Sequence, residues 1–232
     1  MTKKIVKVRG LVKTYKKGKV KTFAVRGIDF ELDEGDFVAL MGPSGSGKST
    51  TLHQIGLLDK PTEGTITIEG KDVSQLNEEQ KTLFRLEKIG FVFQQYELIP
   101  ELTALENVYL PLKCDFNANE NYVQKANEIL DGLGLGDRKN HYPTELSGGE
   151  QQRVSIARAL VKTPKIILAD EPTANLDSAA GQKIMEILKF LNRKYKKTIL
   201  VVNHEPAFEK YFDKIIRIKD GKIVKIETKK RK

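Results

Sequence analysis

Short apolar runs, bounded by charged or turn residues, recur along the chain. Four of them are continuous rather than alternating, namely Phe37–Leu40, Ile89–Phe93, Ile166–Ala169 and Thr198–Val202. Continuous runs of this length are typical of strands that are buried on both faces of a parallel sheet. We therefore predict a parallel core sheet built from these four strands.

Between these runs, apolar residues recur at helical spacing. One stripe consists of Ile184, Ile187, Leu188 and Leu191. Its helix is expected to begin after Asp177 or Ser178, since either side chain can cap a helix. A second stripe consists of Val123, Ala126, Ile129, Leu130 and Leu133, and it ends in glycines at positions 132, 134 and 136. Strands that alternate with helices predict an α/β protein.

Other segments carry the pattern of antiparallel strands. Gly64–Gly70 alternates between apolar and polar residues. Ile215–Ile226 reads as a hairpin, with Asp220 and Gly221 at a type I′ turn. Antiparallel strands are therefore expected to flank the parallel core.

The composition fits one soluble α/β domain, alone or with a smaller inserted subdomain. The chain has 232 residues, of which 39% are hydrophobic and 31% charged. Its apolar runs fall far short of the roughly 18 residues that span a bilayer, and the first residues lack the apolar segment of a signal peptide. We expect a cytosolic protein. The single cysteine, Cys114, excludes an internal disulfide and is interpreted as a packing or surface residue.

The charge balance is basic, with 40 Lys and Arg against 31 Asp and Glu, giving a net charge of +9. Such a balance is compatible with nucleic acid, an anionic membrane surface or a general excess of lysine. The lysines are scattered except in Thr228–Lys232. That segment is interpreted as a solvated tail, with contact to anionic lipid headgroups as the alternative.

A glycine-rich stretch follows the first predicted core strand. Gly42–Ser49 fits the pattern G-x-x-x-x-G-K-[ST] and precedes a helical stretch that contains Leu52 and Ile55. Glycines there let backbone N–H groups surround phosphates, at the positive end of the helix dipole. Lys48 is expected to reach the β- and γ-phosphates, and Ser49 to ligate Mg²⁺. The predicted nucleotide-binding residues are Gly42, Pro43, Ser44, Gly45, Ser46, Gly47, Lys48, Ser49 and Thr50.

Polar side chains also follow the other core strands, where open α/β sheets bind ligands. Asp170 is placed to hold Mg²⁺, and Glu171 to polarise the water that attacks the γ-phosphate. An acidic pair after a strand is more often a solvated strand end, so this interpretation depends on the phosphate loop. Gln94 is expected to contact Mg²⁺ or the attacking water, and His204 to donate to the γ-phosphate.

A second pair of glycines opens the segment Leu146–Arg153. Ser147 and Glu150 form an S-x-x-E capping box for a helix that ends before Pro164. A capping box does not require Gly148 and Gly149, and glycines at a helix N-terminus let another surface approach the exposed N–H groups. We therefore predict a second anion site here. Spacing alone does not decide whether both sites face one ligand.

In combination, "GPSGSGKST", "LSGGEQQR", "IILADEPT" and "VVNHE" resemble the ATP-binding subunit of an ABC transporter. The residues that flank these motifs are most similar to those of the subgroup that serves lipoprotein release, macrolide or peptide export, and cell division. The resemblance covers almost the whole chain. It implies a single domain over 1–232, with a P-loop NTPase core, a mainly parallel sheet, an antiparallel β subdomain, and an inserted helical subdomain at about 95–160.

The resemblance also implies ligands and partners. ATP and Mg²⁺ are the expected cofactors, with Tyr15 stacking on adenine or, alternatively, packing on the core. Ser147, Gly148, Gly149 and Glu150 of one copy would close over the γ-phosphate held by a second copy, and Ala174–Asp177 would let the copies sense each other. A helix of a membrane permease would dock on Gln94–Leu112, where Tyr96, Leu98 and Ile99 supply apolar contacts. The protein would then lie at the cytoplasmic face of the membrane.

Three alternative functions are therefore compatible with the sequence. The first is an ATPase that drives a separate permease, without a nucleic-acid partner. The second is a nucleic-acid-associated ATPase of the same type, which usually carries a long coiled coil between Lys48 and Ser147 or a duplicated cassette, and this chain has neither. The third is a small kinase, which leaves Leu146–Arg153 unexplained.

Overall fold

The computed structural model describes residues 3–113 and 121–229. Cys114 and the last three residues of the basic tail lie outside these ranges, so their predicted roles stay predictions. Within the described ranges, no helix is both long enough and apolar enough to cross a bilayer.

The strands and helices alternate along most of the chain. The strands are β1 (Lys4–Lys17), β2 (Val20–Asp33), β3 (Phe37–Met41), β4 (Glu63–Ile68), β5 (Lys71–Asp72), β6 (Ile89–Val92), β7 (Ile166–Asp170), β8 (Thr198–Asn203), β9 (Lys214–Lys219) and β10 (Lys222–Thr228). The α-helices are α1 (Lys48–Ile55), α2 (Glu78–Lys88), α3 (Ala104–Lys113), α4 (Tyr122–Gly132), α5 (Gly148–Leu160) and α6 (Ser178–Tyr195). Short 3₁₀ helices occupy Gly136–Arg138, Pro143–Glu145 and Pro206–Tyr211.

The central sheet has the strand order β10-β9-β3-β8-β7-β6. Its strands from β9 to β6 run parallel, and β10 pairs antiparallel with β9 at the edge. All four predicted core strands lie in this sheet, which confirms the mainly parallel core. The predicted hairpin is also present, with positive φ at both Asp220 and Gly221 as a type I′ turn requires.

A second sheet is antiparallel, with the order β2-β1-β4-β5. The sequence analysis identified β4 but not the long hairpin of β1 and β2. Register shifts interrupt the pairing of these strands, one of them between Val8 and Leu11, where Gly10 has a φ of 54°. Such bulges break the period of two on which strand prediction rests.

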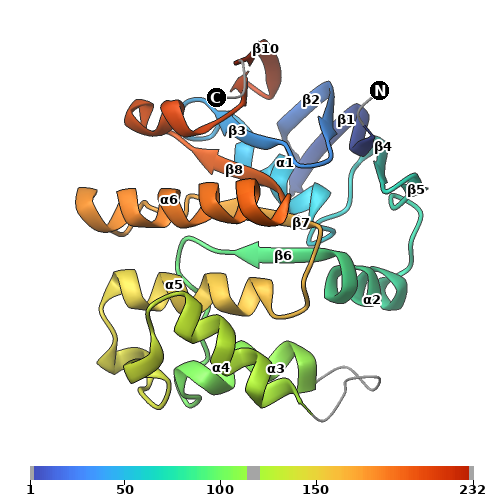
Figure 1. Ribbon diagram of the computed structural model, residues 1–232. Helices are drawn as coiled ribbons and strands as arrows, with labels where there is room; N and C mark the ends of the chain where they lie inside the picture. The colour runs from blue at the N-terminus through green and yellow to red at the C-terminus, as the bar shows by residue number, and fades with distance from the viewer. Residues whose placement is uncertain (1–2, 114–120, 230–232) are drawn as a thin grey trace.

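The central sheet is buried on both faces, as the continuous apolar runs indicate. On β3, Val38 and Leu40 pack with the antiparallel sheet and α1. Phe37, Ala39 and Met41 lie on the opposite face, in the core that α5 and α6 complete. Figure 1 shows α3, α4 and α5 gathered at the bottom, below β6, with β1, β2 and β4 at the upper right. The fold class expected from the sequence is confirmed.

The helices α3, α4 and α5 share an apolar core of their own, to which Val108, Leu130 and Val154 contribute. The stretch expected to form a helical subdomain, 95–160, contains all three. The cap of α6 is Asp177 rather than Ser178, because its side chain accepts a hydrogen bond of 2.8 Å from the N–H of Ala180. We refer to α3–α5 as the helical lobe.

Candidate functional site

The phosphate loop connects β3 to α1, as predicted. Gly47, the residue before the helix, has a φ of 100°. A Cβ atom there would lie 2.3 Å from the carbonyl oxygen of Ala24, so only glycine fits against β2. The loop is therefore packed against the antiparallel sheet, with its backbone amides at the N-terminus of α1.

Lys48 is buried at this helix N-terminus. Its Nζ donates hydrogen bonds to the carbonyl oxygens of Gly42 at 2.9 Å and Pro43 at 2.8 Å. Burial lowers the pKa of Lys48, while the carboxylates of Glu171 and Asp170 act in the opposite direction. The ammonium is thus held beside the loop, in the field of both carboxylates, where an anion would meet it.

Ser46 supplies an observation that points to a ligand. Its side chain is buried, and within the described residues its Oγ has no hydrogen-bond partner. A buried hydroxyl without a partner is costly in a folded protein. A phosphate oxygen in the loop would satisfy it. The other predicted loop residues, Pro43, Ser44 and Gly45, are exposed on the outer side of the turn, and Thr50 is half-buried in the first turn of α1.

The structure brings Ser49 and Asp170 together. The Ser49 Oγ donates a hydrogen bond of 2.8 Å to Asp170 Oδ1, although the residues are 121 positions apart. The Nε2 of His53 lies 3.0 Å from the other oxygen, Oδ2. Sequence reasoning missed His53. Its position four residues after Ser49, one helical turn along α1, is the signal that would have found it.

Glu171 follows Asp170 in a strained backbone conformation. Its φ is 43°, which is uncommon for a residue other than glycine, and its N–H donates to the carbonyl oxygen of Val202. The Glu171 Oε2 lies 3.4 Å from Nδ1 of His204, which follows β8. Two of the strand-end residues singled out in the sequence are therefore neighbours.

Gln94 lies just beyond β6 and is exposed. Its carbonyl oxygen accepts a hydrogen bond of 3.0 Å from Nδ2 of Asn175, in the loop before α6. In the part of the chain that the structure describes, no hydrogen bond joins the Gln94 side chain to Asp170 or Glu171. Gln94 thus lies at the same carboxyl end of the sheet as Asp170 and Glu171. Its contact with a metal or water stays a prediction.

The segment Leu146–Arg153 begins α5 with the predicted capping box. The Ser147 Oγ accepts from the N–H of Glu150, and the Glu150 carboxylate accepts from the N–H and hydroxyl of Ser147, both at 2.8 Å. The Nε of Arg138 donates to the other carboxylate oxygen at 3.0 Å. These bonds, led by those from Ser147, lower the pKa of Glu150 to about 2. The carboxylate of Glu150 is therefore engaged in the cap.

The two glycines of this segment differ in their surroundings. A Cβ on Gly148 would lie 2.9 Å from the hydroxyl of Tyr96 and 3.3 Å from Leu176, so packing within the chain already favours glycine there. A Cβ on Gly149 would be no closer than 3.5 Å to Ala180, an ordinary contact distance. Gly149 is the glycine that packing leaves unexplained.

A cavity of about 410 Å³ lies in front of these residues. We call it the signature cavity. Its lining includes Ser147, Gly149 and Glu150 from the start of α5 and Asn175 and Asp177 from the loop before α6. The exposed N–H groups of the first turn of α5 are thus next to an open space that suits an anion.

Tyr15 lies on β1 with 45% of its surface exposed, so the alternative that it packs in the core is wrong. Its hydroxyl donates a hydrogen bond of 2.7 Å to Asp59 Oδ2. The Nζ of Lys13 lies 4.9 Å from the ring centroid and also pairs with Asp59. Sequence reasoning missed Asp59 and Lys13, since no local pattern links β1 to the loop after α1.

Comparison with known proteins identifies the relatives of this chain. Residues 25–174 match the protein family described as ABC transporter. An uncharacterized ABC transporter ATP-binding protein of Methanocaldococcus jannaschii is 49% identical, over 97% of this chain and all of that protein. The lipoprotein-releasing system ATP-binding protein LolD 2 of Caulobacter vibrioides is 42% identical, over 95% of this chain and 97% of that protein.

A solved structure agrees in fold and sequence. The dimeric structure of a post-hydrolysis state of the ATP-binding cassette MJ0796, bound to ADP and Pi, superposes with a TM-score of 0.91. That protein, also from M. jannaschii, is 46% identical in the superposition, which covers 98% of this chain and 100% of that one. Similarity of this extent along nearly the whole chain shows that the chain belongs to the ABC transporter family.

Proposed function

We propose that this chain is the ATP-hydrolysing subunit of an ABC transporter and that it drives a separate membrane permease. The observation that carries the proposal is the hydrogen bond between Ser49 and Asp170. It joins the phosphate loop to the strand end that also bears Glu171. The groups that would bind phosphate, bind the metal and activate water therefore lie together at the carboxyl ends of the parallel strands. The relative bound to ADP and Pi supports the same reaction.

The phosphates would bind to the backbone amides of the loop Gly42–Thr50 and to the N-terminus of α1. Lys48 would exchange its two carbonyl partners in the loop for oxygens of the β- and γ-phosphates. Ser46, whose hydroxyl is buried without a partner, would donate to the same group. Tyr15 would stack on adenine with the ring face that Lys13 leaves open.

The donor set also fits Mg²⁺. Among the described residues, no cluster of three or more His, Cys, Asp and Glu could hold a metal alone. Mg²⁺ typically takes only one or two protein carboxylates and completes its shell with substrate phosphates and water. Ser49 and Asp170, with Gln94 as a further oxygen donor, match that pattern. When bound, the ion would neutralise charge on the phosphate oxygens.

Glu171 would act as the general base. A water oxygen attacks the γ-phosphorus, the water proton passes to the Glu171 carboxylate, and the bond between the γ-phosphorus and the bridging oxygen of ADP breaks. His204 would hold Glu171 and donate to the γ-phosphate, consistent with its Nδ1 lying 3.4 Å from the carboxylate. Catalysis then rests on positioning and on charge neutralisation.

A second copy would complete each site. The signature cavity, with Ser147, Gly148, Gly149 and the capped Glu150, would close over the γ-phosphate that the phosphate loop of the other copy holds. Support comes from the unexplained glycine at Gly149, from the open cavity in front of it, and from the dimeric state of the MJ0796 cassette. Nucleotide binding would therefore drive head-to-tail dimerisation.

The permease would contact the segment Gln94–Leu112. Leu98 is half-buried and Ile99 is exposed, so both offer apolar surface there. Tyr96 and Glu97 have positive φ, and Arg158 donates to the carbonyl oxygens of both. The hydroxyl of Tyr96, in this turn, lies beside Gly148. Force at the permease contact would therefore reach the signature cavity. The protein would accordingly lie at the cytoplasmic face of the membrane.

Glu171→Gln tests the catalytic part of this proposal. The amide keeps the size of the side chain but cannot accept the water proton, so turnover should fall about 100-fold or more. ATP binding should persist, and the protein should accumulate as a dimer in ATP. Phosphate release and size-exclusion chromatography measure the two effects.

Glu87→Gln is the matched control, because Glu87 is an exposed carboxylate on α2. This variant should keep full turnover. Unchanged turnover in the Glu171 variant would remove that residue from the role of base.

A further inference from the structure

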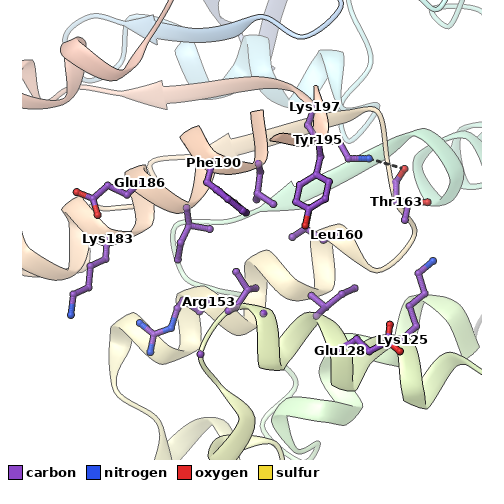
Figure 2. Close-up of a pocket in the computed structure, with 16 residues that line it drawn as sticks. Lys125, Glu128, Arg153, Leu160, Thr163, Lys183, Glu186, Phe190, Tyr195 and Lys197 are labelled. Atoms are coloured by element: carbon purple, nitrogen blue, oxygen red, sulfur yellow. Dashed lines mark hydrogen bonds between the residues drawn. The ribbon is translucent and has the colours of Figure 1, made fainter. Parts of the chain in front are cut away.

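A groove of about 970 Å³ separates the helical lobe from α6. Figure 2 shows α4 and α5 on one side of it and α6 on the other. Thr163 and Lys197, in the loops before β7 and β8, line one end. The volume is at the upper end of the roughly 300–1,000 Å³ of small-molecule sites. None of the nucleotide-site residues from the phosphate loop, β7 or β8 lines it.

The walls of the groove are mainly apolar. Leu133 and Leu160 of the helical lobe face Ile187 and Phe190 of α6, and each is at least partly accessible. Phe190 and Tyr195 are 52% and 54% exposed, and their rings contact edge to face at 5.9 Å. Figure 2 shows both rings extending from α6 into the groove, on the side of Leu160. Large exposed aromatic residues that line one concavity are suited to a hydrocarbon chain.

Two lysines, Lys125 and Lys197, line this end of the groove. The Nζ of Lys197 donates to the carbonyl oxygens of Thr163 at 3.2 Å and Pro164 at 2.6 Å. Burial lowers the pKa of Lys197, and the positive charge of Lys125 lowers it further. In the described ranges, the Lys125 side chain forms no hydrogen bond or ion pair. This end of the groove therefore carries two lysines that no ion pair among the described residues neutralises.

The carboxylates of the groove do not neutralise these cations. Glu128 accepts a hydrogen bond of 3.0 Å from Gln124, and Glu186 accepts one of 2.9 Å from Gln182, each on its own helix. Within 3–113 and 121–229, neither forms an ion pair. An occupant would thus have to bring its own negative charge to the lysine end.

The opposite end of the groove is different. Arg153 and Lys183 line both the groove and the signature cavity, so that end opens toward a second space. Lys125 and Lys197 line only the groove. Both ends of the groove therefore carry cations, and Lys125 and Lys197 are the pair that belongs to the groove alone.

We propose that this groove binds an alkyl chain of an anionic amphiphile. Its carboxylate or phosphate head would pair with Lys125 and Lys197, and its alkyl chain would lie along Leu160, Ile187 and Phe190. The cations of the groove and its apolar walls carry the inference, which does not depend on ATP hydrolysis. A free fatty acid and an anionic membrane lipid share this chemistry.

Calorimetric titration of the full chain, without nucleotide, tests the proposal. Dodecanoate and dodecyl phosphate are the probes, kept below their micelle concentrations, with neutral dodecyl maltoside for comparison. We expect one anionic amphiphile per chain, bound at least about tenfold more tightly than the neutral one because of the charge-assisted hydrogen bonds. Equal binding of the neutral amphiphile, or no binding of the anionic ones, would overturn the proposal.

Two variants locate the site. Lys125→Glu should weaken dodecanoate binding by about tenfold or more, because it reverses the charge at the head-group position. Lys71→Glu makes the same change in net charge on the exposed strand β5 and should bind as the parent does. Phe190→Ser removes an exposed ring from the wall, so it should weaken binding while leaving the thermal unfolding curve in place. Equal affinity in the Lys125 and Lys71 variants would contradict the assignment.

Vesicles distinguish the two sources of the amphiphile. Lys125-dependent binding to vesicles of phosphatidylglycerol, together with weaker binding of soluble dodecanoate, would identify a membrane lipid. Strong binding of soluble dodecanoate, with no Lys125-dependent vesicle binding, would identify a free fatty acid. Vesicle binding that Lys125→Glu leaves unchanged would place any lipid contact elsewhere and count against the groove.

Discussion

Tyr15 shows how the orientation of a single residue, which we propose to bind adenine, depends on distant partners. Its ring is exposed on β1, yet its hydroxyl is fixed by Asp59, 44 positions along the chain. Lys13 pairs with the same carboxylate and donates to the carbonyl oxygen of Lys60 at 2.7 Å. Three contacts thus hold one aromatic ring in a single orientation, and an oriented ring loses less entropy when a base stacks on it.

Replacement of Tyr15 separates the ring from its hydroxyl. Tyr15→Ala removes the stacking surface, so the KM for ATP should rise by about tenfold or more while kcat changes little. Tyr15→Phe keeps the ring and loses only the bond to Asp59, so its KM should lie between those of the parent and the alanine variant. Steady-state kinetics measure both. If Tyr15→Ala lowered kcat at an unchanged KM, Tyr15 would not be the adenine platform.

At the scale of the element, α5 combines a strong cap with an N-terminus that is open to the signature cavity. The cap ties Glu150 to Ser147 and Arg138. With these bonds made, Gly149 can remain open to the signature cavity without fraying the helix. Stability of the first turn and access to its amides are thus provided by different residues of one short segment.

The lowered pKa of Glu150 gives the cap a defined pH dependence. The pKa falls from an ordinary 4.5 to about 2 in the folded chain. A group with a lowered folded pKa stabilises the fold above its unfolded pKa, and this contribution is lost as pH falls from about 4.5 toward about 2. Glu150→Gln keeps a hydrogen-bonding side chain but loses the charge, so it should lower the free energy of unfolding near neutral pH by about 1–2 kcal/mol.

Urea unfolding at several pH values measures this effect. The difference between the parent and Glu150→Gln should shrink as pH drops through that window. Glu101→Gln removes the same charge from an exposed position and should show no comparable loss near neutral pH. A difference that stays constant with pH would mean that the carboxylate charge does not support the cap.

On the scale of the whole molecule, the two helix ends that we propose to bind phosphate belong to different parts of the fold. The phosphate loop packs against the antiparallel sheet, whereas the start of α5 belongs to the helical lobe. Among the described residues, no hydrogen bond joins Ser147–Glu150 to Gly42–Thr50. A site that needs both would therefore be assembled from two copies, as we propose above.

Gly149→Asp tests assembly without disturbing the fold. A Cβ there meets only ordinary contacts, and an acidic residue in the first turn of a helix is tolerated by the dipole, so thermal unfolding should be unchanged. The carboxylate would, however, repel the γ-phosphate across the dimer interface. The double variant Glu171→Gln with Gly149→Asp should therefore stay monomeric in ATP on size exclusion, whereas Glu171→Gln alone should dimerise. Normal turnover in Gly149→Asp would contradict the shared site.

Much of the fold could be predicted because the patterns that specify strands, helix caps and turns extend over only a few residues. The core strands, the caps of α5 and α6 and the turn at Asp220–Gly221 follow from local periodicity and turn chemistry. The long hairpin of β1 and β2 could not be predicted in this way, since bulges shift its alternation. The helices α2 and α3 were also not identified individually. At the site, the residues with motif spacing were found, whereas His53, Asp59 and Lys13 were not.

The sequence by itself determined which chemical groups each segment offers. Lys48 and Ser49 belong to a phosphate-loop pattern and Asp170 and Glu171 follow a buried strand, and both patterns depend only on the local backbone. Tertiary structure alone decided which of these groups meet. The bond from Ser49 to Asp170 depends on the order of β3, β8 and β7 in the sheet. The groove beside Lys125 exists only where the helical lobe lies against α6. Such contacts depend on how distant elements pack, and no local pattern along the chain encodes them.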